Sequence, residues 1–348
     1  MKRVTRSLLL LLLSAALLLS LAACRNTPNR EEAAPAEEES TIQIGMTFDS
    51  FVIERWLRDQ DIFVSTAQNL GAEVYVQNAN GDVDEQIAQV EYFIEKEMDA
   101  IVIVAVDCYA MSSVIQKAKE AGIVVVSYDR LMMNADLDLY ISFNNETVGR
   151  MMGESLAENL AYGSDIVCIT GPYSDTNVNA VMDGFASAIS GRGLNIVYER
   201  PADGWLAEVA YEGVSEAIEE GIGFSGIMCG NDDLATQAFQ ALSEHRMAGS
   251  VSLVGQDADL AACQRIVEGT QTMTVYKPVE KLARAAAEYT ILLVQGQPLD
   301  FTSTMDNGFE EVPTQLIEPI KVTADNMEEV IIDGGFHLRD EVYLNVNN

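Results

Sequence analysis

From Thr41 onward the chain alternates between short apolar runs and longer stretches with a helical period. The runs are rich in β-branched residues and cover 42–46, 73–77, 100–106, 122–128, 139–143, 165–170, 195–199, 225–230, 251–256 and 271–276. The stretch 55–71 predicts a helix whose apolar stripe contains Trp56, Leu57, Phe63, Val64, Ala67 and Leu70. Apolar strands that alternate with amphipathic helices predict a parallel sheet covered on both faces.

Ten such strands are many for one open sheet, and the strand–helix rhythm pauses near 143–150 before it restarts. We therefore predict an α/β fold with two doubly wound parallel-sheet lobes. After Tyr276 a helix over 278–296 and a further crossing over 312–323 would carry the chain between the lobes again, which makes a multi-strand hinge. The expected lobes are 41–147 with 276–312, and 148–275 with 313–348.

The N-terminus has the pattern of an exported protein. Basic residues precede an apolar run over 8–21, which is typical of a secretory signal peptide, here 1–23. The run closes with "LAAC", which resembles a bacterial lipobox and predicts cleavage before Cys24 and a lipid on its sulfur. An ordinary signal with an incidental cysteine is the alternative. The Pro- and Glu-rich residues 24–40 predict a flexible tether.

The net charge of the chain indicates which classes of partner it can bind. Removal of residues 1–23 leaves 18 of the 21 basic residues and all 54 acidic ones, a net charge of 18 − 54 = −36. Such a surface repels nucleic acid and anionic lipid, so we expect no nucleic-acid partner. It suits a soluble domain that a lipid holds at the outer face of the cytoplasmic membrane, or one in the periplasm. Four further cysteines form no CxxC pair and are expected to be buried apolar residues rather than disulfides or ligands: Cys108, Cys168, Cys229 and Cys263.

Polar residues recur where the predicted strands end. In open α/β sheets, ligands bind outside the carboxyl ends of the strands. A single residue there could be a solvated loop residue, but the recurrence predicts a binding site. The set is Phe48, Asp49, Asp107, Asp129, Arg130, Asn144, Asn145, Asp175, Asn177, Asn231, Asp232, Gln256, Asp257 and Lys277.

The sequence offers little chemistry beyond binding. "GIGFSG" at 221–226 matches GxGxxG, but it follows a predicted helix and opens a strand, which is the reverse of a dinucleotide site. The sequence contains no Walker A, HExxH or GxSxG motif. His245 and His337 are its two histidines, and neither has a metal-ligand neighbour. We predict no catalytic residue, no cofactor and no metal.

The motifs "ERWLRDQDIF", "VQNANG", "SYDR", "ADLDLYISFNNETVG", "DGWL", "GND", "GQDADL" and "GTQTMTVYKP" follow one another from about Ile42 to His337. In this order and spacing the chain resembles the D-xylose-binding proteins of bacterial ABC importers, within the type I periplasmic binding proteins. The resemblance implies a pyranose gripped between two lobes by charged, amide and aromatic side chains. Carried over motif by motif, the binding residues are Arg55, Trp56, Asp129, Arg130, Asp175, Asn177, Trp205, Asn231, Asp232, Asp257 and Lys277.

Two segments depart from the family pattern. "AVDCY" at 105–109 stands where the family tends to have Pro-Tyr-Asn, and "SFNN" at 142–145 replaces Ser-Phe-Asp-Asn. Both departures bear on which sugar is bound, and neither alters the expected fold.

Together, the lipobox-like motif and the family resemblance predict a monomeric, lipid-anchored receptor that closes around a monosaccharide, with D-xylose as first choice, and delivers it to an ABC permease. One alternative is a sensor subunit that presents its closed form to a membrane histidine kinase. Another is a sugar-modifying enzyme. A LacI-type repressor shares the fold, but the export signal and the lack of an N-terminal helix-turn-helix in this sequence contradict it.

The lipobox-like motif gives a first prediction. Cys24→Ser removes the sulfur that would carry the lipid, so the protein should leave the membrane fraction or keep its signal peptide uncleaved. Fractionation and mass spectrometry of the N-terminus would measure both. A Cys24→Ser protein that is processed normally and stays in the membrane fraction would contradict lipidation.

Overall fold

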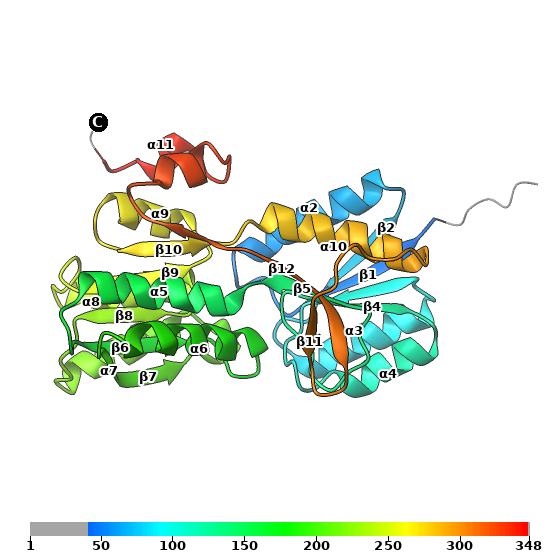
Figure 1. Ribbon diagram of the computed structural model, residues 1–348, viewed down its shortest axis with the longest axis horizontal. Coiled ribbons are helices and arrows are strands. Elements are labelled where there is room, and N and C mark those ends of the chain that lie inside the picture. Colours follow the sequence, from blue (N-terminus) through cyan, green and yellow to red (C-terminus); the bar gives the residue numbers. More distant parts are fainter. Residues whose placement is uncertain (1–40, 347–348) are drawn as a thin grey trace, which may run out of the picture. The chain divides into compact units, whose positions relative to one another are not determined.

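Two sheets, each layered with helices, build residues 41–346, the part of the chain that the computed structural model describes (Figure 1). The predicted signal peptide, Cys24 and tether lie outside the described residues. Thr41–Asn348 forms one compact unit. The α/β fold with two doubly wound lobes is confirmed.

The first sheet has the strand order β11-β12-β5-β4-β3-β1-β2. Its strands are β1 (Gln43–Phe48), β2 (Glu73–Asn78), β3 (Ala100–Ile103), β4 (Val124–Tyr128), β5 (Leu139–Phe143), β11 (Thr304–Asp306) and β12 (Glu311–Ile317). They pair in parallel, except that β11 runs antiparallel to β12. Helices α2 (Arg55–Asn69) and α10 (Val279–Val294) cover one face, and α3 (Val83–Glu95) and α4 (Ser112–Glu120) cover the other (Figure 1).

The second sheet has the order β13-β10-β9-β8-β6-β7. Its strands are β6 (Asp165–Thr170), β7 (Asn195–Pro201), β8 (Gly226–Cys229), β9 (Ser252–Gln256), β10 (Met273–Tyr276) and β13 (Ile320–Val322), the last antiparallel to β10. Its helices are α5 (Asn145–Asn159), α6 (Thr176–Ser190), α7 (Glu208–Glu219), α8 (Asp232–Glu244) and α9 (Leu260–Val267). Three short elements complete the fold: η1 (Asp203–Trp205), η2 (Glu328–Ile332) and α11 (Arg339–Val342).

Both faces of each sheet are apolar because helices cover both. In β6, Ile166 and Cys168 belong to the apolar cluster under α5 and α6, whereas Val167 and Ile169 belong to the cluster on the opposite face. Successive strand residues point to opposite faces, so an unbroken apolar run supplies two helix layers at once. This explains why the strands read as continuous runs in the sequence.

The chain crosses between the sheets at 143–145, 276–279 and 317–320 in the described residues. The first two crossings lie at or close to the lobe boundaries expected from the sequence. The last differs from expectation, because β12 pairs with β5 through Ile317 and so continues past the boundary expected at 312. The final crossing therefore follows Ile317 and leads directly into β13.

Two local expectations have different outcomes. The stripe expected on α2 is partly wrong: Leu57 and Leu70 are exposed, whereas Arg55 and Asp59 are buried. The buried face of this helix carries charge because it covers the functional site described below. By contrast, the segment 221–226 is a turn between α7 and β8, as predicted, and Cys108, Cys168, Cys229 and Cys263 are buried free thiols.

The close packing of α5 on α6 generates a stability prediction. A Cβ at Gly184 would lie 1.9 Å from the Glu146 carbonyl oxygen, so Gly184→Ala must push the helices apart. We expect a loss of about 1–3 kcal/mol in the free energy of unfolding, measured in urea. Gly191→Ala is the matched control, because Gly191 has a helical φ of −67° and open space around it. Equal stabilities of the two variants would contradict the tight helix contact.

Candidate binding site

A cavity lies where the carboxyl ends of both sheets meet, and its empty space, open solvent included, measures about 490 Å³. Loops that follow strands of both sheets contribute side chains to it, as expected for open α/β sheets. Ten of the predicted binding residues line the cavity: Arg55, Trp56, Asp129, Arg130, Asp175, Asn177, Trp205, Asn231, Asp257 and Lys277.

Arg55 enters the cavity from the first turn of α2. Its Nε and NH2 donate to the two carboxylate oxygens of Asp59, at 3.2 and 2.9 Å, and its NH1 lies 3.0 Å from Asp129 Oδ2. Tyr128 also donates to Asp59 Oδ1, at 2.5 Å. Asp59 is fully buried, so its bidentate contact fixes the guanidinium plane and leaves NH1 facing the cavity side.

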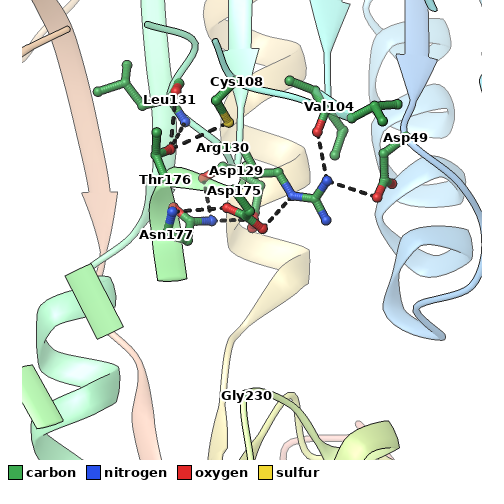
Figure 2. A network of polar contacts seen from close by, with 12 residues as sticks. Asp49, Val104, Cys108, Asp129, Arg130, Leu131, Asp175, Thr176, Asn177 and Gly230 are labelled. Atoms are coloured by element: carbon green, nitrogen blue, oxygen red, sulfur yellow. Dashed lines mark hydrogen bonds and ion pairs between the residues drawn. The ribbon is translucent and has the colours of Figure 1, made fainter. Parts of the chain in front are cut away.

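Arg130 is a buried bridge between the two lobes (Figure 2). Its NH1 lies 2.8 Å from Asp49 Oδ2 and 2.7 Å from the Ala105 carbonyl oxygen, both after strands of the first sheet. Its Nε lies 2.8 Å from Asp175 Oδ2, the N-cap residue of α6 beside the second sheet. Arg130 therefore forms ion pairs with one acid from each lobe, and neither of them is the adjacent Asp129.

Asp129 and Asn177 form a second contact between the lobes. Asn177 Nδ2 donates to Asp129 Oδ1 at 2.9 Å and to the Asp129 carbonyl oxygen at 3.0 Å (Figure 2). Asp129 has a φ of +66°, a left-handed conformation that is uncommon among residues other than glycine and costs about 1–3 kcal/mol. Ser142 Oγ donates to the same carbonyl at 2.5 Å, so several hydrogen bonds hold this backbone in place.

The second lobe supplies amide and charged groups from the ends of its strands. Asn231 is the N-cap of α8, and its Oδ1 accepts from Leu234 N at 2.9 Å. Gln256 Nε2 donates to the Gly230 carbonyl at 2.5 Å. Asp257 Oδ1 and Lys277 Nζ form an ion pair at 2.9 Å, and both side chains are buried.

The two tryptophans lie at different places in the cavity lining. Trp56 is 2% exposed and lies beside both arginines, with Arg55 Cζ 4.4 Å and Arg130 Cζ 5.7 Å from its ring centroid. Trp205 follows Gly204 in η1 with a φ of +57°. Its ring lies so close to Gly171 that a Cβ there would come within 2.3 Å of it. Glycine at this strand end is therefore required for the position of the ring.

The pKa values of the acids in the site are shifted in different directions. Burial raises the pKa of Asp49 and of Asp175 by more than the facing Arg130 lowers it. Burial acts on Asp129 in the same direction, but Arg55, Lys277 and Arg130 outweigh it and hold its pKa below the ordinary value. Asp129 is therefore the carboxylate whose ionised form the site stabilises most clearly.

Asp232 is a correction to the predicted site, because it does not line the cavity. It is fully buried at the start of α8, where its carboxylate accepts from Thr274 Oγ1 at 2.6 Å and Gln271 Nε2 at 2.9 Å. Burial raises its pKa strongly. The neighbouring Asn231 points to the cavity, and one step along the chain turns Asp232 into the interior of the second lobe.

Sequence reasoning did not assign roles to several residues that the structure brings to the cavity. Asn145 and Gln256 line it, and both had been noted only as polar residues at strand ends. Apolar lining residues of α6 and β8 carried no signal in the sequence: Val178, Val181, Met182 and Met228. Asp59 was missed because its position in α2 predicts a solvated helix residue.

Several buried polar atoms in and beside the cavity have no hydrogen-bond partner among the described residues. They include Asp49 Oδ1, Trp56 Nε1, Arg130 NH2, Trp205 Nε1 and Gln256 Oε1. A buried polar atom without a partner costs about 1–3 kcal/mol, so such a group needs a specific explanation. Donors and acceptors occur together in this set, which is the requirement for binding a polar ligand.

Two further features, a metal-binding cluster and a membrane-spanning helix, are absent from residues 41–346. No group of three or more His, Cys, Asp or Glu side chains there could hold a metal ion. Every helix in that part of the chain is too short or too polar to span a bilayer.

With this geometry in view, comparison with known proteins identifies the family. The chain belongs to the periplasmic binding proteins, since the model of the periplasmic binding protein domain matches residues 44–298. It is 40% identical over 308 residues to the D-xylose-binding periplasmic protein of Haemophilus influenzae, covering 87% of this chain and 92% of that protein. Identity to the D-xylose-binding periplasmic protein of Escherichia coli K12 is 38% over 328 residues, covering 92% and 98%.

A solved structure supports the same assignment. An ABC transporter solute-binding protein from Clostridium phytofermentans with bound β-D-glucose matches with a TM-score of 0.78 and 28% identity, covering 86% of this chain and 99% of that chain. The family resemblance that the sequence motifs predicted is confirmed.

The bridging geometry of Arg130 generates a stability prediction. Lysine keeps the charge but cannot reach two carboxylates and a carbonyl from a planar fork. Arg130→Lys should therefore lower the free energy of unfolding by about 1–3 kcal/mol in urea. The matched control is Arg150→Lys, because Arg150 is half-exposed and its contacts with Glu154 and Thr147 lie within its own helix. We expect the control to change stability by less than about 0.5 kcal/mol. An Arg130→Lys protein as stable as the control would mean that the bridge contributes nothing.

Proposed function

We propose that this protein is an extracytoplasmic receptor that binds a neutral monosaccharide, with D-xylose as first choice, and delivers it to an ABC permease. The observation that carries the proposal is the set of buried cavity atoms without a hydrogen-bond partner in residues 41–346: Trp56 Nε1, Arg130 NH2, Trp205 Nε1 and Gln256 Oε1. The names of the two D-xylose-binding relatives support the choice of sugar.

A sugar matches this set because each hydroxyl can donate one hydrogen bond and accept two. The two indole nitrogens and Arg130 NH2 supply donors, whereas Gln256 Oε1 supplies an acceptor. Bonds to charged groups such as Arg130 contribute more than bonds between neutral groups, about 1.5–3 kcal/mol. A molecule that carries several hydroxyls on one ring can satisfy these groups together.

Charge favours a neutral sugar over a sugar acid or a sugar phosphate. The cations of the network are Arg55, Arg130 and Lys277. The acids of the network outnumber them: Asp49, Asp59, Asp129, Asp175 and Asp257. An anionic ligand would add a like charge to a buried site that already holds an excess of acids. The same excess disfavours an enzymatic role for Arg130 or Lys277 as a free cation, because both are already paired.

Transport rests on closure of the two lobes about the crossings at 143–145, 276–279 and 317–320. Because cavity residues come from both lobes, a ligand held between them stabilises the closed form, which a permease can then recognise. A sensor that presents the closed form to a membrane histidine kinase would use the same geometry. The proposal also includes the lipid anchor at Cys24, the monomeric state and a location at the outer face of the cytoplasmic membrane or in the periplasm.

Sugar binding can be tested through stability. D-xylose at 100 times its Kd should stabilise the fold by roughly 2.7 kcal/mol and raise the Tm of the full-length protein. Sucrose should leave the Tm unchanged because of its size, and D-glucuronate because of its charge. Differential scanning calorimetry over a panel of pentoses and hexoses measures this. If none of these sugars raises the Tm, the protein is not a monosaccharide receptor.

A further inference from the structure

The C-terminal segment contacts the second lobe close to the cavity. The contact comes from His337, which lies outside residues 44–298, the part of the chain that the family model matches. His337 follows η2, and its Nε2 lies 2.8 Å from the Ala258 carbonyl oxygen. A carbonyl oxygen only accepts, so Nε2 carries the proton and donates. Burial, the largest effect on this ring, lowers the pKa of His337, which favours the neutral imidazole.

The backbone that His337 contacts is strained at the edge of the cavity. Asp257 has a φ of +96° and Ala258 a φ of +58°, so two successive residues other than glycine adopt left-handed conformations. Such conformations cost about 1–3 kcal/mol each and persist only where surrounding contacts enforce them. The strain places the Asp257 carboxylate in the cavity, where it pairs with Lys277.

Four contacts hold this turn. Asp257 N donates to the Val275 carbonyl at 2.8 Å, and Ala258 N donates to Thr274 Oγ1 at 3.2 Å. Both come from β10, on one side of the turn. His337 holds the Ala258 carbonyl from the C-terminal segment, with a weaker contact from Cys263 Sγ at 3.4 Å. Loss of the imidazole would leave a buried carbonyl with only a thiol donor.

The segment that carries His337 is itself anchored to the first lobe. Arg58 of α2 donates to the Phe336 carbonyl from both NH1 and NH2, each at 3.1 Å, and its Cζ lies 4.1 Å from the Phe336 ring centroid. On the other side, the Tyr276 ring lies 4.7 Å from the Phe336 ring. The support behind Ala258 is therefore fixed from both lobes and cannot move away freely.

We infer that His337 is a positioning residue for ligand binding, which holds the Asp257–Ala258 turn in the conformation that presents Asp257 to the cavity. The inference rests on the proposed function, because it assigns Asp257 a contact with the sugar. It adds the C-terminal segment to the binding machinery, although no atom of His337 is required to touch the ligand.

A double-mutant cycle tests the inference with the full-length protein and D-xylose in a calorimeter. His337→Ala should raise the Kd by about three- to tenfold, the worth of one hydrogen bond. His337→Gln offers an amide donor to the same carbonyl and should return the Kd to within about twofold of the wild-type value. His245→Ala is the matched control, because this second histidine is exposed at the C-terminus of α8, and it should leave the Kd unchanged.

The cycle separates positioning from a general loss of stability. If His337 acts through Asp257, His337→Ala should change the Kd by less than about twofold in an Asp257→Ala background. Equal losses in both backgrounds, or no loss in the wild-type background, would overturn the inference. Hydrogen exchange of peptides that cover 257–259 gives a readout without ligand. His337→Ala should speed exchange there and not in β1, and unchanged exchange at the turn would also overturn it.

The failure of this inference and that of the proposed function are distinguishable. A wild-type protein that binds no sugar removes the proposed function, and with it the ligand role of Asp257. A wild-type protein that binds D-xylose while His337→Ala binds it equally well removes only the role of His337.

Discussion

A buried guanidinium that bridges carboxylates from both lobes is the interaction on which the site depends. Arg130 contacts Asp49 in the first lobe and Asp175 in the second, and it is 2% exposed. Burial of an ion costs several kcal/mol, and the contacts of Arg130 Nε and NH1 with two carboxylates and the Ala105 carbonyl offset part of that cost, whereas NH2 is left without a partner in residues 41–346. Because one of the acids belongs to each lobe, this compensation is greatest when the lobes lie together. The charge that makes the cavity polar therefore also favours a closed arrangement.

The same logic explains why the site is a network rather than a set of separate side chains. Asp59 fixes Arg55, Arg55 pairs with Asp129, and Asp129 accepts from Asn177 of the opposite lobe. Each charged group lowers the desolvation cost of the group it pairs with. Polar atoms of the network that have no protein partner are available to a ligand in the cavity. A ligand that satisfies those atoms adds hydrogen bonds to groups whose desolvation has already occurred on folding. Binding energy at such a site therefore comes from preorganisation as much as from the number of contacts.

The sequence predicts the fold well because the strands are continuous apolar runs and both sheets follow one topological rule. It predicts the cavity residues through a second rule, that ligands bind at carboxyl strand ends, and through motif resemblance. It fails where burial depends on tertiary contacts. A helix stripe cannot show that Arg55 and Asp59 are buried while Leu57 is exposed, since this depends on partners distant in sequence. Nor can adjacency in "GND" show that Asn231 faces the cavity and Asp232 the core. The lobe boundary expected at 312 falls inside β12, because the pairing of β12 with β5 is a long-range contact that leaves no local signal in the sequence.

Backbone strain shows how the surrounding structure maintains the site. Asp129, Trp205, Asp257 and Ala258 all have positive φ, and the first three line the cavity. Local propensity opposes each of these conformations, so their energy must come from contacts elsewhere in the fold. For Asp129 the contacts come from Ser142 and Asn177, and for the Asp257–Ala258 turn they come from β10 and from the C-terminal segment. Segments that are remote from the cavity in sequence thus supply the contacts that hold the strained backbone of the cavity residues in place. The contacts that maintain the cavity therefore include one from His337 in the C-terminal segment.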